Sequence, residues 1–112
     1  MGFLASGCNN CEKLTERLCQ DLGPEDCASW REAGGPDRLI PSGRGVNKAC
    51  GMIMDIDASY QGGLQGARAV AVGQQLKKAR AANDDAKVAE LTAKQAKITL
   101  EIQASIAKLR QQ

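Results

Sequence analysis

NNCEKLTERLCQDLGPEDC, residues 9–27, is the stretch of sequence that decides the fold. Asn9 followed by Glu12 is the capping-box arrangement that starts a helix. Apolar residues then recur on one face at helical spacing: Cys11, Leu14, Leu18 and Leu22. Gly23 and Pro24 end this helix and begin another, because glycine is common just after a helix and proline at its first position. The stretch therefore predicts two helices joined by a tight turn.

Working outward, we expect these helices over about 10–22 and 24–32, with Trp30 as the largest apolar anchor of the second. Ser42 is a suitable N-cap for a third helix. Gly51 in the middle of that helix indicates close approach of another backbone. The apolar residues of the third helix follow three-to-four spacing: Val46, Cys50, Ile53 and Ile56, or Asp57 in place of Ile56.

All five cysteines lie in the first 50 residues: Cys8, Cys11, Cys19, Cys27 and Cys50. Their spacing lacks the second close pair that zinc sites use, and the chain has no histidine. The Cys8-x-x-Cys11 pair lacks the βαβ pattern of a thioredoxin-like site, so a thiol-redox or metal-handling role is a lesser alternative. A small core needs covalent cross-links to be stable, and the cysteines therefore predict structural disulfides.

Helix geometry selects the pairing of four of these cysteines. Cys11 and Cys19 lie in one helix, eight residues and roughly 12 Å apart, beyond the reach of about 7 Å between bonded Cα atoms. This excludes their bond and its complement, Cys27 with Cys50. Cys19 and Cys27 stand level on either side of the turn, whereas Cys11 lies near the far end of its helix. We therefore expect the bonds Cys19–Cys27 and Cys11–Cys50.

Cys8 is then the odd cysteine, and the residues before it suggest lipidation. Leu4-Ala5-Ser6-Gly7-Cys8 resembles a bacterial lipobox, in which the cysteine carries a lipid. Residues 1–6 also match the N-myristoylation pattern on Gly2, with Cys8 available for palmitoylation. Both patterns predict a lipid anchor at residues 1–8, and the alternative is an unmodified tail.

From about residue 59 the composition changes. The glycine-rich residues 59–66 indicate a hinge or a loosely wound helical start, and an Ala-, Gln- and Lys-rich segment without proline follows. Asn83-Asp84-Asp85 suits a turn, with Asn83 as N-cap of a last helix, so a helical hairpin is favoured over one long helix. The last helix carries an apolar stripe for a protein partner or self-association: Val88, Leu91, Ile98, Ile102, Ile106 and Leu109.

Composition excludes several classes of function. Leu, Ile, Val and Phe make up about 19% of the chain, with one Phe, one Trp and one Tyr. Net charge is −3 over residues 1–63 and +5 over 64–112. The cations of residues 64–112 are too widely spaced for a nucleic-acid surface. Adjacent acids such as Asp55 with Asp57, or Asp84 with Asp85, are typical of helix ends rather than of catalytic pairs. We expect no catalytic residues, no metal, no cofactor and no nucleic-acid partner.

Cysteine, glycine and tryptophan recur through three stretches of the chain: residues 19–30, Gly34-Gly35-Pro36 and residues 41–50. In this they resemble the small cysteine-containing predicted lipoproteins of myxobacteria and related bacteria. The resemblance implies export and oxidation, and it supplies no catalytic residue.

The sequence as a whole predicts an all-α protein with a tail (1–8), a disulfide-stapled three-helix head (9–58) and an Ala-rich long helix or hairpin (59–112). We expect a non-enzymatic, exported structural or interaction protein, lipid-anchored in the bacterial periplasm or at the outer membrane surface. The alternative is a membrane-surface or oligomeric assembly protein that uses its amphipathic last helix.

Overall fold

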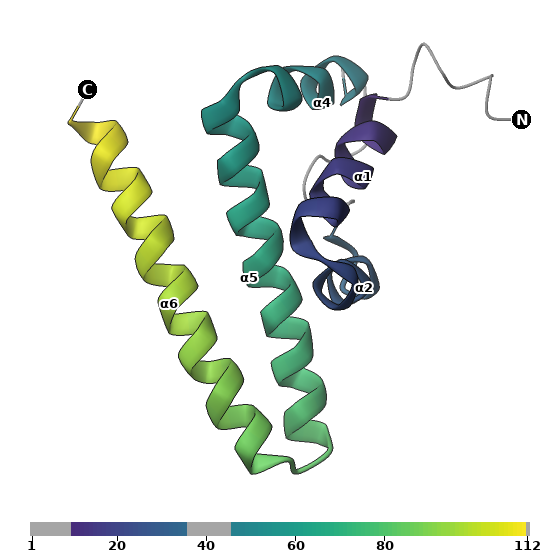
Figure 1. Cartoon of the computed structure of the whole chain (residues 1–112), viewed down its shortest axis with the longest axis vertical. Helices are drawn as coiled ribbons and strands as arrows, with labels where there is room; N and C mark the ends of the chain where they lie inside the picture. Colours follow the sequence, from purple (N-terminus) through teal and green to yellow (C-terminus); the bar gives the residue numbers. More distant parts are fainter. Residues whose placement is uncertain (1–9, 36–45, 112) are drawn as a thin grey trace, which may run out of the picture.

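The computed structural model describes residues 10–35 and 46–111, which form five α-helices (Figure 1). They are α1 (Asn10–Leu22), α2 (Pro24–Glu32), α4 (Val46–Asp55), α5 (Asp57–Ala81) and α6 (Asp85–Arg110). No strand occurs in these two ranges. The predicted all-α class is confirmed, and α1 and α2 have the expected bounds. The caps expected at Asn9 and Ser42 lie outside the described residues.

Helices α1 and α2 form the predicted hairpin. Gly23 adopts a φ of 91°, which favours glycine, and Pro24 takes the first position of α2. The backbone N–H of Gly23 donates to the carbonyl of Cys19 at 3.1 Å, and that of Cys27 donates to the carbonyl of Gly23 at 2.9 Å. The hairpin buries one face of α1 and the largest side chain of α2: Leu14, Leu18, Leu22 and Trp30.

Helix α4 lies against the start of α1. The backbone N–H of Asn10 donates to Oδ1 of Asn47 at 2.8 Å, and Nδ2 of Asn10 donates to the carbonyl of Asn47 at 3.2 Å. Asn47 thus satisfies a free N–H at the N-terminus of α1 from another helix. A Cβ on Gly51 would lie 2.8 Å from Nδ2 of Asn10, so the expected close approach exists but involves a side chain rather than a backbone.

Helix α5 begins earlier than the sequence predicts. The break before it is the single extended residue Ile56 (φ −107°, ψ 109°). Residues 59–66 lie inside the helix, which agrees with the expected helical start and not with the alternative of a hinge. Tyr60 and Leu64 are buried in the head, and this packing offsets the low helix propensity of the neighbouring glycines. Ile56 was expected on the buried face of the third helix, but it is 49% exposed because α4 ends at Asp55.

Two hydrophobic clusters share α5, which packs against each of the other four helices. The first joins the first half of α5 to the head: Leu14, Leu18, Leu22, Trp30, Cys50, Tyr60, Leu64, Ala67 and Ala71. The second joins its last part to α6: Val72, Leu76, Ala79, Leu91 and Ile98. The head core therefore extends into α5, beyond the boundary expected at residue 58.

A turn between α5 and α6 makes the helical hairpin, as favoured from the sequence. Asn83 was expected to cap α6, but it adopts a left-handed φ of 56° just after α5. Asp84 is the cap instead, because its Oδ1 accepts the backbone N–H of Lys87 at 3.1 Å. The N–H of Asp84 donates to the carbonyl of Ala79 at 3.0 Å, which completes a Schellman-type ending of α5.

Substitutions at Asn83 and Asp84 should separate their two roles. Asp84→Ala removes the cap of α6 and should lower the free energy of unfolding by about 1 kcal/mol. Asn83→Gly should leave stability unchanged or raise it slightly, since glycine adopts positive φ readily. Urea unfolding followed by circular dichroism measures both, and equal losses for the two variants would contradict this assignment.

Candidate interaction site

The structure contains both disulfides that the helix geometry of the sequence indicates. Cys11 is bonded to Cys50 with 4.9 Å between their Cα atoms, and Cys19 to Cys27 with 4.8 Å. Cys11 is thus unavailable to the Cys8-x-x-Cys11 pair in this state. Cys8 itself lies outside the described residues.

The two bonds close loops of different length and should differ in their contributions. Replacing Cys11 and Cys50 together by Ala opens a 39-residue loop and should cost about 4 kcal/mol in the chain-entropy model. Replacing Cys19 and Cys27 opens an eight-residue loop and should cost about 2.5 kcal/mol. Chemical unfolding of the two double variants, with the wild-type chain as reference, checks the order. A larger loss for the short loop would contradict it.

Tyr60 fastens α5 to α1. Its side chain is 1% exposed, and its hydroxyl donates to a carboxylate oxygen of Asp21 and lies 3.2 Å from the carbonyl oxygen of Arg17. The guanidinium of Arg17 lies 3.9 Å from the ring centroid and donates to the carbonyl of Met54 at 3.3 Å. Burial, followed by the hydrogen bond to Asp21, raises the pKa of Tyr60 to about 12. The phenol therefore stays protonated and acts as a structural hydrogen-bond donor.

This pKa can be measured directly because Tyr60 is the single tyrosine. The tyrosinate absorbance of the folded protein should have its midpoint near pH 12, against 10 for the unfolded chain. The folded state keeps the proton longer, so the contribution of Tyr60 to stability is complete below pH 10 and is lost as the pH rises toward 12.

Two variants control this titration. Asp21→Asn should move the midpoint back toward 10, and Tyr60→Phe should remove this part of the loss of stability at alkaline pH. A wild-type midpoint at 10 would refute the contact between α1 and α5.

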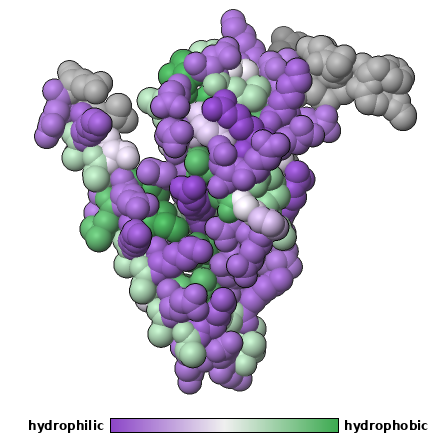
Figure 2. All heavy atoms as spheres, in the orientation of Figure 1, coloured by the Kyte–Doolittle hydropathy of each residue, from purple (hydrophilic) through white to green (hydrophobic). Residues whose placement is uncertain are grey.

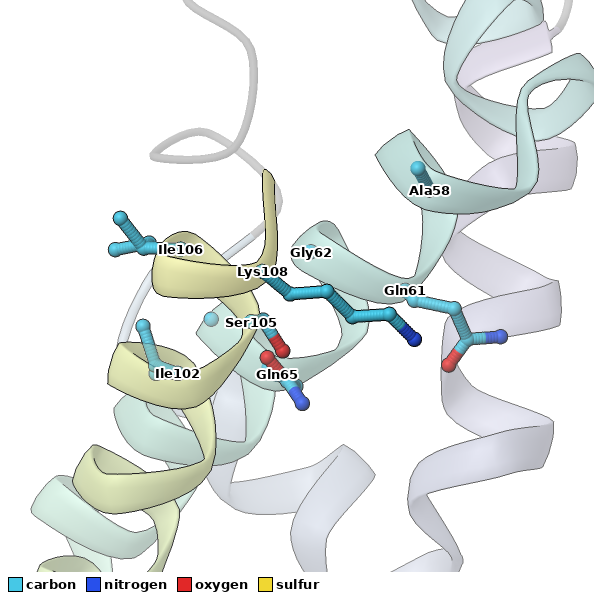
Figure 3. A pocket seen from close by; sticks show the side chains of 9 residues that line it. Ala58, Gln61, Gly62, Gln65, Ile102, Ser105, Ile106 and Lys108 are labelled. Atoms are coloured by element: carbon cyan, nitrogen blue, oxygen red, sulfur yellow. The ribbon is translucent and has the colours of Figure 1, made fainter. Parts of the chain in front are cut away.

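Helices α5 and α6 move apart with increasing distance from the turn that joins them (Figure 1). A groove lies between them at the open end, between the start of α5 and the end of α6. Its volume is about 460 Å³, and it is lined mainly by apolar groups. Helix α5 contributes Ala58, Gln61, Gly62, Gln65 and Gly66, and α6 contributes Ile102, Ser105, Ile106 and Lys108. Figure 2 shows apolar surface on α6 and in the hollow beside it. In Figure 3, Ile102 and Ile106 project to one side of α6, and Lys108 extends toward Gln61.

Two glycines give the α5 side of the groove its open shape. A Cβ placed on Gly62 or Gly66 would meet no heavy atom within 4 Å. Packing within the described chain therefore does not require glycine at either position, although each costs the helix about 1 kcal/mol relative to alanine. Both belong to the stretch for which a hinge or a loosely wound helical start was expected. Their spacing of four residues was the available signal, since it places them on one face of a helix.

The predicted stripe on α6 is divided by the fold. Its part near the turn packs against α5, with Leu91 and Ile98 buried and Val88 and Ile102 partly buried. Ile106 is 45% exposed. The side chain of Leu109 lies outside what the structure describes. Leu100, which the stripe does not include, is 65% exposed, so the free apolar surface of α6 belongs to its second half.

The groove offers binding groups and no pair of groups suited to acid–base chemistry. Its lining combines aliphatic side chains, two amides, a hydroxyl and one ammonium group. The acids Asp55, Asp57, Asp84 and Asp85 are exposed at helix ends. Within residues 10–35 and 46–111, no cluster of metal-ligating side chains forms, and no helix is long and apolar enough to span a bilayer.

Comparison of the chain with protein-family models, with curated proteins and with solved structures gave no match. A function must therefore be argued from the residues of this chain.

Proposed function

We propose that the chain is a non-enzymatic, exported helical protein, held at a bacterial membrane surface by a lipid on Cys8. It acts through an interaction surface at the open end of its α5–α6 hairpin. The observation that carries this proposal is the cysteine pairing. Four of the five cysteines are joined in two disulfides, so Cys8 is the one left over, directly after a lipobox-like run.

The disulfides support export. Both lie in the head, where they cross-link short helices around a small core. Such bonds persist in oxidising compartments and are rare where thiols are kept reduced. The periplasm, or the outer surface of a bacterial membrane, is the location that combines oxidation with a lipidated N-terminal cysteine.

The groove supports an interaction role over catalysis. Its largely apolar lining suits a surface that buries apolar groups of another molecule. Among the described residues, Tyr60 is the one group whose pKa is strongly shifted, and it is buried between α1 and α5 and does not line this groove. The candidate site therefore offers recognition without an evident reacting group.

A second candidate is a membrane-surface protein that uses α6. The exposed Leu100 and Ile106 beside the basic last turn, with Lys108 and Arg110, favour it. This function requires that the unlipidated chain pellet with vesicles of anionic lipid and that salt release it. A chain that stays in the supernatant with such vesicles would exclude it.

Lipidation of Cys8 is the decisive test of the first proposal. In the protein isolated from bacterial membranes, mass spectrometry of the N-terminal peptide should show an acylated Cys8 and four oxidised cysteines. Cys8→Ser should move the chain from the membrane fraction to the soluble fraction, because the other cysteines are already paired.

Two controls accompany this variant. Asn9→Ser should leave the chain on the membrane, and Gly2→Ala tests whether a lipid on Gly2 holds it instead. A free Cys8 thiol in the native protein, or a Cys8→Ser chain that stays on the membrane, would contradict the proposal.

A further inference from the structure

Four large apolar side chains stay exposed among the described residues, and one of them, Ile106, lines the groove at the open end of the α5–α6 hairpin. Met52 and Ile56 are 52% and 49% exposed at the corner between α4 and α5. Leu100 and Ile106 are 65% and 45% exposed on the second half of α6. Ile106 therefore adds an exposed apolar side chain to a groove whose lining is largely apolar, and such a combination is typical of a docking surface.

The two sides of this surface carry opposite charges. Asp55 and Asp57 lie at the α4–α5 corner, next to Ala58 of the groove lining. Lys108 and Arg110 lie in the last turn of α6, and Lys108 lines the groove itself. All four are exposed, and none of them forms an ion pair with another described residue. One side is therefore acidic and apolar, and the other is basic and apolar.

A surface of this kind is complementary to itself. In a two-fold symmetric pair whose axis runs along the groove, each side of the patch meets the opposite side of the other copy's patch, so the acidic side of one copy faces the basic side of the other. The groove then receives the exposed Ile106 from the other copy, and the bare faces of Gly62 and Gly66 allow that helix to approach closely. An anionic ligand would be repelled by the acidic side, and a cationic ligand by the basic side.

We infer that the open end of the α5–α6 hairpin binds a second copy of this chain and forms a symmetric homodimer. This inference rests on the proposed function and names the partner of the same surface. It assigns Ile106 and the two groove glycines to the centre of the interface. It assigns Asp57 and Lys108 to opposing positions across the two-fold axis.

Sedimentation equilibrium of the oxidised full chain with Cys8→Ser measures the association without cross-linking through the odd cysteine. The mass should rise from one 11.9 kDa chain to two as concentration increases. Ile106→Lys should weaken the dimer roughly tenfold or more, whereas Ala93→Lys, an exposed position on the same helix, should not. Gly66→Leu should also weaken it, and circular dichroism should show that the monomer stays helical because the new side chain enters open space.

A charge exchange provides the sharpest readout. Lys108→Glu alone and Asp57→Lys alone should each abolish most of the self-association, since each places like charges opposite one another. An equimolar mixture of these two variants should form a heterodimer, because both cross-interface pairs are then of opposite sign. A purely structural role of either residue within one chain would not produce this recovery.

Three outcomes would overturn the inference: a wild-type chain that is monomeric at all concentrations, a dimer that Ile106→Lys leaves intact, or a variant mixture that stays monomeric. If the chain is a monomer and dodecanoate stabilises it, the groove binds an acyl chain. If the chain is a monomer and pellets with anionic vesicles, the groove binds a membrane. A monomeric chain that is still acylated on Cys8 and oxidised would refute the dimer and leave the proposed anchoring and export standing.

Discussion

The bond between Cys11 and Cys50 ties the first turn of α1 to the middle of α4, and the placement of α5 depends on it. Helix α4 has ten residues, with Cys50 buried and Ile53 and Met54 partly buried against the same core, so the covalent bond reinforces a small apolar contact. A single extended residue separates α4 from α5. The cross-link therefore fixes the corner between α4 and α5. One turn after this corner, Tyr60 secures α5 to α1.

Close approach of backbones compensates for the scarcity of large apolar side chains. Three of the buried residues on α5 are alanines, which let neighbouring helices come near its axis. Trp30, the largest buried side chain, packs so tightly on Gly35 that a Cβ there would overlap the indole ring. Close packing at small residues and two disulfides together supply stability that a larger protein gains from aliphatic packing.

Local rules explain why much of the fold is predictable from sequence. The first two helices follow from a Gly-Pro boundary and a leucine face. The disulfide pairing follows from the rise per residue of a helix and from the Cα–Cα distance that a disulfide can span. The turn near residues 83–85 is also local. The cap was predicted at Asn83 instead of Asp84 because both residue types suit a cap, and only the backbone conformation distinguishes them.

Tertiary packing explains what the sequence could not show. The glycines of residues 59–66 predict a hinge by propensity, yet burial of Tyr60 and Leu64 keeps that stretch helical. The groove was missed for the same reason, because Gly62 and Gly66 form a surface only when the stretch is a helix and α6 diverges from it. The α6 stripe was found, but which part of it stays free depends on how far α5 covers it.

Covalent and aromatic groups are unevenly distributed between the two clusters. Both disulfides, Trp30 and Tyr60 belong to the head, whereas the sequence of α6 contains neither cysteine nor an aromatic residue. Within the described residues, α6 packs mainly on α5, and Lys94 pairs with Asp26 of α2 at 3.9 Å. Amide hydrogen exchange should therefore be fastest in α6 among the long helices. Because Trp30 belongs to the other cluster, its fluorescence would not report a separation of α6 from α5.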